Sequence, residues 1–219
     1  MRVLLLISIS LFSASAIFAQ TAPLSENDSV SYSLGIIMGT SIGDAGINDL
    51  NDELFMKAIK DAINKAQPLL TPEQANVFLN QYVVKLTQKR AVKNLEESMA
   101  YMTENSRKEG VVTLPSGLQY KVIRDGIGDM PVDTSHVTVH YKGTLVDGTE
   151  FDSSFQRGQP AQFMLNRVIP GWTEALKLMK TGAKWILYIP PTLAYGERGT
   201  KGIPPNSVLI FEVELLNVQ

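Results

Sequence analysis

One stretch of the sequence, residues 71–110, contains no glycine before its last residue and no proline after its second. Its start carries a strong helix signal, because Thr71 suits the N-cap, Pro72 suits the first helical position and Gln74 completes a capping box. A helix of about 38 residues would be about 57 Å long, whereas a small domain is about 30 Å across. The stretch predicts a rod that ends only at Gly110 and extends beyond the domain in which it begins.

The two halves of this rod differ in composition. The apolar residues of the first half recur at helical spacing, at Ala75, Leu79, Tyr82 and Leu86. After Gln88 the sequence is dominated by lysine, arginine, glutamate and asparagine. We therefore expect the first half to pack against apolar surfaces and the second half to lie mostly in water.

Two shorter helices are predicted before the rod. Their apolar positions have helical spacing, at Val30, Leu34 and Ile37 in the first helix and at Phe55, Ile59, Ala62 and Ala66 in the second. The glycine-containing stretch 43–46 ends the first helix. Asn51 is a suitable N-cap for the second, with Asp52 and Glu53 in its first turn, and we expect Pro68 to end it.

These two helices and the first half of the rod together amount to about 65 residues and bury only a small core. Their exposed apolar faces are expected to meet a second copy of the chain, so we expect a homodimer. The alternative is a monomeric helical cap.

The first nineteen residues combine Arg2, an apolar run over residues 3–11 and small residues that end at Ala19. This pattern predicts a secretory signal peptide that is cleaved before Gln20. The apolar run is too short to span a bilayer stably, although a retained signal anchor is the alternative. The sequence has no cysteine, which excludes disulfides, thiol catalysis, thiolate metal sites and a lipidated cysteine.

Charge and histidine content argue against nucleic-acid and metal chemistry. The formal net charge is −2 and no basic stripe is present, so we expect no nucleic-acid partner. His136 and His140 are an even number of positions apart within a strand pattern, which places them on one face. A two-histidine metal site would need a third ligand, and none lies nearby. Solvated strand residues are the better interpretation, and we expect neither a metal nor a cofactor.

Beyond Pro115 the apolar pattern changes from helical to alternating. The strand positions that face one way are Val137, Val139 and Tyr141, and later Leu209, Phe211, Val213 and Leu215. Asp147 and Gly148 form a hairpin-turn dipeptide. One helix interrupts the strands, with apolar residues at Trp172, Ala175, Leu176 and Met179 and a stop at Gly182. The fold class is α+β: an N-terminal helical module, a long connecting helix, and a twisted antiparallel sheet wrapped on one short helix, with a pocket between that helix and the sheet.

Four strings carry a resemblance to a known family. They are VTVHYKGTLVDGTEFDSS, VIPGWTEAL, AYGERG and LIFEVELL, and by their order and spacing residues from about Gly117 to Gln219 resemble the FKBP-type peptidyl-prolyl cis/trans isomerases. The helical part, with GVVTLPSGLQYKVI after it, resembles the periplasmic members of the macrophage infectivity potentiator type. After the predicted signal peptide at 1–19, the resemblance implies a helical dimerisation module at 20–70, a connecting helix at 71–110 and an isomerase domain at 111–219. It also implies export to the periplasm or the outer membrane of a bacterium.

The resemblance implies a pocket for a proline ring, with Trp172 as its floor. The walls would be Tyr141, Phe151, Phe163, Val168 and Phe211. Ile203 would close the rim, the backbone N–H of Ile169 would receive a substrate carbonyl, and the Tyr195 hydroxyl would donate to a second carbonyl.

Asp152 is the one charged group in this constellation. By the resemblance, Arg157 and the Tyr141 hydroxyl lie against it and keep it ionised. Its role would be electrostatic contact with the twisted amide, rather than that of a general base. The alternative is that Asp152 only holds its loop through these two partners.

The resemblance implies an isomerase that acts on X-Pro bonds of unfolded or partly folded secreted proteins. The alternative is a non-catalytic dimeric chaperone that holds apolar segments of unfolded proteins. The sequence departs from the family pattern at two places around the pocket. Ala161 stands where some members have an aromatic residue, which predicts a wider cleft. The loop 199–205 is about one residue shorter than in the best-known small members, with Thr200 in place of a histidine. Macrolide inhibitors are a further ligand class of the family, and the altered rim leaves open whether they bind.

Overall fold

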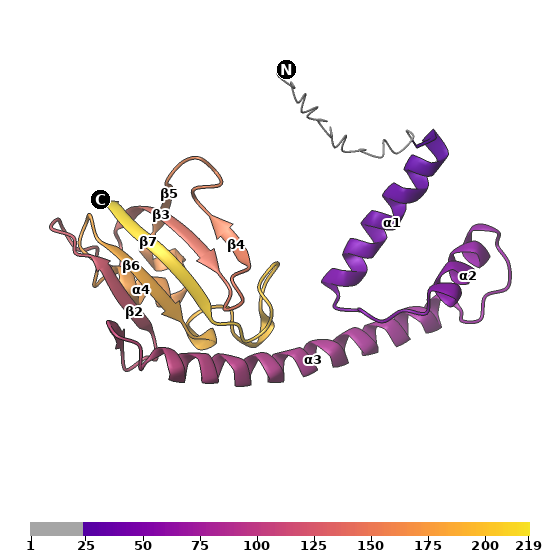
Figure 1. The fold of residues 1–219 in the computed structure, drawn as a ribbon, viewed down its shortest axis with the longest axis horizontal. Helices are drawn as coiled ribbons and strands as arrows, with labels where there is room; N and C mark the ends of the chain where they lie inside the picture. Colours follow the sequence, from indigo (N-terminus) through magenta and orange to yellow (C-terminus); the bar gives the residue numbers. More distant parts are fainter. Residues whose placement is uncertain (1–23) are drawn as a thin grey trace, which may run out of the picture. The chain divides into compact units, whose positions relative to one another are not determined.

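The computed structural model describes residues 24–219, so the expected signal peptide at 1–19 lies outside the described residues (Figure 1). The chain divides into two compact units between Leu50 and Asn51. The first unit contains helix α1 (Glu26–Asp44), which Ser25 caps by accepting a hydrogen bond from the Asp28 N–H. No helix within residues 24–219 is long and apolar enough to cross a membrane.

The second unit begins with helix α2 (Asp52–Ile63), which starts as expected because the Asn51 side chain accepts from the Leu54 N–H at 3.0 Å. Its end was predicted wrongly. The helix stops at Ile63, before Pro68, because Lys65 adopts a left-handed φ of 53° and the Ala66 N–H donates to the Asp61 carbonyl at 2.9 Å. This is a Schellman-type ending in which lysine takes the position that glycine usually fills.

The long helix α3 (Pro72–Asn105) has the predicted capping box, in which Thr71 and Gln74 satisfy each other's backbone N–H groups. Its 34 residues correspond to a length of about 51 Å. The helix ends at Asn105 and not at Gly110. Asn105 is fully buried and its amide donates to the Gln119 side chain at 2.9 Å, and the chain then turns into the sheet.

The expectation that the second half of α3 lies mostly in water is wrong for one of its faces. On that face Asn94 donates to the Pro205 carbonyl at 2.7 Å and Ser98 donates to the Asn206 carbonyl at 2.6 Å. Polar side chains make these contacts, so the hydropathy pattern gives no sign of them. In the first half of the helix, by contrast, Phe78 is 66% exposed in a single chain.

The C-terminal part of the second unit is a seven-stranded antiparallel sheet in the order β1-β2-β6-β7-β3-β4, with β5 paired to β3 (Figure 1). Its strands are β1 (Val111–Thr113), β2 (Gln119–Arg124), β3 (His136–Thr144), β4 (Glu150–Ser153), β5 (Ala161–Met164), β6 (Lys184–Ile189) and β7 (Leu209–Val218). Three 3-10 helices lie between strands: η1 (Leu165–Arg167), η2 (Pro191–Leu193) and η3 (Gly196–Arg198). The predicted hairpin joins β3 to β4, with Gly148 at a φ of 86°.

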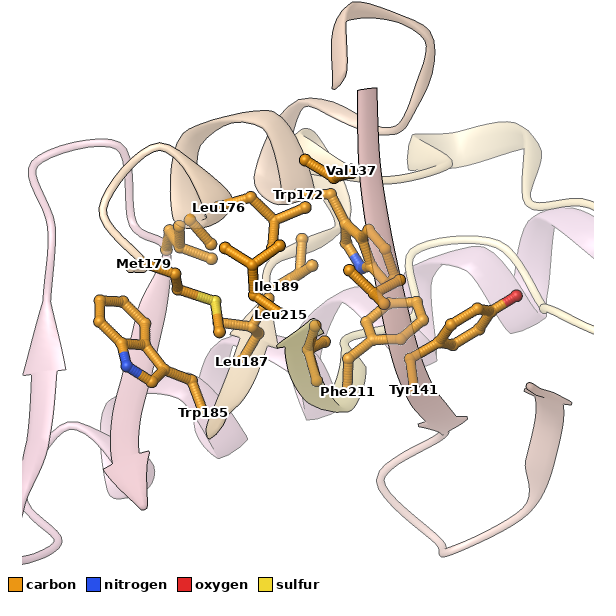
Figure 2. Close-up of a cluster of buried hydrophobic side chains, with 14 of the residues drawn as sticks. Val137, Tyr141, Trp172, Leu176, Met179, Trp185, Leu187, Ile189, Phe211 and Leu215 are labelled. Atoms are coloured by element: carbon orange, nitrogen blue, oxygen red, sulfur yellow. The ribbon is translucent and has the colours of Figure 1, made fainter. Parts of the chain in front are cut away.

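The predicted alternation sets the core. The apolar positions of β3 and β7 are buried, and they meet the short helix α4 (Pro170–Leu176) and β6 (Figure 2). Helix α4 ends at Leu176, before the expected stop at Gly182. Successive turn hydrogen bonds follow the helix, from the Leu178 N–H to the Ala175 carbonyl and from the Met179 N–H to the Leu176 carbonyl, and Met179 is still fully buried. The helix therefore presents its apolar face to the sheet, as the pocket prediction requires.

Candidate active site

A cavity of about 660 Å³ opens between α4 and the sheet. Its lining includes all ten residues that were expected to bind or act there: Tyr141, Phe151, Asp152, Phe163, Val168, Ile169, Trp172, Tyr195, Ile203 and Phe211. They come from β3, β4, β5, the segment between η1 and α4, α4 itself, the segments before and after η3, and β7, so the fold brings distant segments to one place. Thr200, which the sequence argument placed at the rim, also borders the cavity. Three further lining residues were not singled out from the sequence: Arg167, Ala194 and Lys201.

Trp172 projects from α4 toward the sheet and is only 4% exposed (Figure 2). Aromatic rings from the sheet meet its indole edge to face, with centroid distances of 5.1 Å to Tyr141, 5.2 Å to Phe211 and 5.7 Å to Phe163. Each such aromatic pair stabilises the fold by about 0.5–1.5 kcal/mol in addition to the burial of its apolar surface, so the indole is firmly held. Its Nε1 is buried and has no hydrogen-bond partner among the described residues.

Gly143 on β3 makes room for the aromatic wall, and the sequence argument missed it. A Cβ at this position would lie 2.6 Å from Cζ of Phe151 and 2.8 Å from Cε1 of Phe211. These two rings meet edge to face at 5.4 Å directly over the glycine. A glycine inside a strand often marks such a close approach, which is the signal that could have identified it.

Helix α4 is placed by the three residues that open it. Ile169 is its N-cap, with extended φ and ψ of −61° and 147°, and Pro170 occupies the first helical position. A Cβ on Gly171 would lie 2.4 Å from Cγ2 of Ile189, so glycine allows the helix to approach β6 closely. Ile169 borders the cavity, and the backbone hydrogen bonds among residues 24–219 leave its N–H without an acceptor.

Asp152 forms a connected group with Tyr141 and Arg157, as the resemblance implied. The Tyr141 hydroxyl donates to one carboxylate oxygen, Arg157 pairs with the other, and Arg157 also donates to the Tyr141 oxygen at 2.8 Å. Figure 2 shows this hydroxyl directed away from the buried cluster.

The charges of this group follow from its contacts. Partial burial acts to raise the pKa of Asp152, but the hydrogen bond from Tyr141 and the ion pair with Arg157 outweigh it and hold the pKa below its usual value. Burial, followed by the hydrogen bond to Asp152, raises the pKa of Tyr141. At neutral pH the carboxylate is therefore ionised and the phenol is neutral.

Tyr195 and Ile203 lie at the mouth of the cavity. Tyr195 precedes η3 and is 42% exposed, so its ring is not part of the core. Ile203 is held by two backbone hydrogen bonds with Thr200, both 2.9 Å long. Lys201, between them, brings a positive charge to the mouth.

The family follows from comparison with known proteins. The model described as FKBP-type peptidyl-prolyl cis-trans isomerase matches residues 128–216, and the model of the domain amino terminal to it matches residues 27–122. The outer membrane protein MIP of Legionella longbeachae is 40% identical over 222 residues, covering 98% of this chain and 95% of that protein. The chain belongs to the FKBP-type peptidyl-prolyl cis-trans isomerases.

Other relatives agree with this assignment. The 22 kDa FKBP-type isomerase of Escherichia coli is 44% identical, covering 86% of this chain and 93% of that protein. The crystal structure of FkpA from Escherichia coli is 37% identical with a TM-score of 0.68, covering 90% of this chain and 99% of that one. The resemblance, the fold class and the isomerase class predicted from the sequence are thus confirmed.

Ala161 pairs with Val139 in the sheet and packs against the core, and the wider cleft that its small side chain predicts stays a prediction. One expectation about this FKBP domain needs correction. His140 is not simply solvated, because its Nδ1 lies 2.9 Å from the Ser154 hydroxyl and its ring stacks on Phe155 at 4.6 Å. His140 therefore supports the loop after β4.

Proposed function

We propose that this isomerase binds the proline ring of an X-Pro segment over the Trp172 indole and accelerates rotation of the preceding bond. The observation that carries the proposal is the open cavity of about 660 Å³ with a rigid aromatic floor. A proline ring is apolar and lacks a backbone N–H, so an aromatic pocket suits it.

The reaction requires no covalent intermediate. Amide resonance produces a barrier of about 18–20 kcal/mol, and rotation must break that resonance. The planar amide is strongly dipolar, whereas the twisted amide is less so, and a dry aromatic cavity disfavours the planar state more. Hydrogen bonds placed for the twisted geometry add to this difference. We assign these bonds to the Ile169 N–H and the Tyr195 hydroxyl.

We assign Asp152 a positioning and electrostatic role. Both of its oxygens already accept hydrogen bonds, from Tyr141 and Arg157, and its lowered pKa keeps it unprotonated. A general base would need a free oxygen directed at the substrate. The carboxylate instead fixes the Tyr141 ring as a wall and contributes a negative field beside the bound amide.

The test is kinetic and uses a short proline peptide. We expect Trp172→Leu to lower kcat/KM for cis/trans isomerisation by at least about ten-fold, because it removes the floor that defines the ring subsite. Tyr195→Phe deletes one hydroxyl from an exposed residue and should lower kcat/KM by about three- to ten-fold, the value of one hydrogen bond. Trp185→Phe, at an indole that does not line the cavity, is the matched control. An inactive wild-type protein would exclude the proposed function.

We further propose that residues 20–70 form a dimerisation module, residues 71–110 the connecting helix and residues 111–219 the isomerase domain, with the apolar surface of the module continuing onto the start of α3. The support is a groove of about 520 Å³ between α2 and α3 that is lined largely by apolar side chains, including Leu54, Leu69 and Leu70. These side chains are more than half exposed in a single chain, as expected of a surface that a second copy covers.

The same exposed apolar residues also favour a second activity, in which the dimer holds apolar segments of unfolded clients. Clients would be secreted proteins, because the pattern of residues 1–19 predicts export and the family resemblance implies the periplasm or outer membrane of a bacterium as the destination. Suppression of aggregation of an unfolded protein, measured with the Trp172→Leu variant, separates the two activities. If holding is independent of the pocket, the variant retains it.

A further inference from the structure

The segment Gly196–Asn206 forms the rim of the proposed proline pocket. It carries Thr200, Lys201 and Ile203, which line the cavity, and it directly follows Tyr195. Its base is closed by a hydrogen bond from the Asn206 N–H to the Gly196 carbonyl at 2.8 Å. The position of the whole rim therefore depends on where Asn206 is held.

Asn206 is held by helix α3. Its side-chain amide donates to the Ala91 carbonyl at 2.9 Å, and its own carbonyl accepts from the Ser98 hydroxyl at 2.6 Å. Asn94 supplies a third bond, to the carbonyl of the adjacent Pro205. Because Ala91, Asn94 and Ser98 are three and four residues apart, they lie on one face of the helix.

The contact between α3 and Asn206 is buried and specific. Ser98 is 5% exposed and Asn206 is 6% exposed, so their hydrogen bonds are shielded from competing water. Asn206 also has a left-handed φ of 54°, which among the described non-glycine residues only Lys65 shares. Asparagine tolerates this conformation better than most residues, and surrounding contacts must maintain it.

We propose that Ser98 and Asn206 are positioning residues for the isomerase pocket, through which helix α3 fixes the rim loop that carries Ile203 and follows Tyr195. The inference rests on the proposed proline-binding function of this cavity. It gives the connecting helix a role in substrate recognition in addition to its role as a spacer. The substrate concerned is the segment around the proline, since the rim does not form the floor.

The experiment compares full-length variants in the proline-peptide assay. Ser98→Ala removes one buried hydroxyl, and Asn206→Gly removes the side-chain bond while glycine still accepts the left-handed φ. Thr87→Ala is the matched control, because its hydroxyl bonds only to the Val83 carbonyl of the same helix, at 2.9 Å. Asn206→Asp keeps the size of the residue but places a carboxylate oxygen against the Ala91 carbonyl.

We expect Ser98→Ala and Asn206→Gly each to raise KM about three- to ten-fold with kcat within about two-fold, because each removes one hydrogen bond that fixes the rim. Asn206→Asp should raise KM most. Thermal unfolding of each variant verifies that it is folded at the assay temperature.

The possible outcomes separate failure of the proposed isomerase function from failure of the positioning role of Ser98 and Asn206. A wild-type protein without isomerase activity would remove the proposed function and this inference with it. An active wild type, with KM values for Ser98→Ala and Asn206→Gly equal to that of Thr87→Ala, would overturn the inference alone. Equal losses of kcat and folded fraction, with KM unchanged, would likewise overturn it, because the residues would then be only structural.

Discussion

Replacing Gly143 by alanine should damage stability and activity together, because this glycine lies under two pocket rings. The added Cβ would be 2.6 Å and 2.7 Å from two atoms of Phe151 and 2.8 Å from Phe211. Favourable carbon contacts are about 3.5–4.0 Å long, so the overlap is roughly 1 Å. Both rings are walls of the cavity and Phe211 also packs on Trp172, so neither can move without changing the pocket.

Overpacking of this kind costs about 1–3 kcal/mol, and we expect Gly143→Ala to lower the free energy of unfolding by that amount in urea titrations. Displacement of the Phe151 wall by about 1 Å should also lower kcat/KM ten- to a hundred-fold in the folded protein. Gly35→Ala is the control, since a Cβ there meets nothing within 4 Å. A Gly143→Ala variant with wild-type stability and wild-type activity would refute the reasoning.

Three further predictions concern other parts of the chain. The folded-state pKa of Asp152 is lowered, so its contacts contribute stability above about pH 4, and the contribution is lost as the pH falls through the lowered pKa. Because the Asp152 and Arg157 side chains are 42% and 44% exposed, this contribution to the free energy of unfolding is below about 1 kcal/mol. In the Asp152→Asn variant the free energy of unfolding should therefore fall less steeply as the pH is lowered below about 4. Leu79→Lys should shift the solution mass from dimer to monomer in light scattering, with peptide isomerisation retained; an unchanged mass would contradict the dimer proposal. Thr71→Ala removes the capping box of α3 and should lower the stability of this helix by about 1 kcal/mol, measurable by thermal unfolding followed by circular dichroism.

Local signals determined what could be predicted of the helices. The start of α3 needs only Thr71, Pro72 and Gln74, which are adjacent in sequence, and it was predicted correctly. The ends of the helices depend on contacts that the sequence does not display. Asn105 ends α3 through a bond to Gln119, and Lys65 ends α2 by taking a conformation that lysine rarely adopts.

The same distinction applies to the site. The family resemblance identified ten of the residues that line the cavity, and the strand alternation placed two of them, Tyr141 and Phe211, on the inward faces of their strands. Gly143 was missed because a glycine has no side chain to enter a hydropathy pattern. The polar face of α3 was missed because Asn94 and Ser98 resemble solvated residues until Asn206 is placed beside them.

The central claim is that a proline ring binds against Trp172, and the chain has only one other tryptophan. In a Trp185→Phe variant the indole fluorescence comes from Trp172 alone. Titration with a proline peptide should then give a saturable change in that fluorescence, and the same peptide with alanine in place of proline should give none. Equal responses to both peptides, or no response to either while isomerase activity persists, would contradict the account.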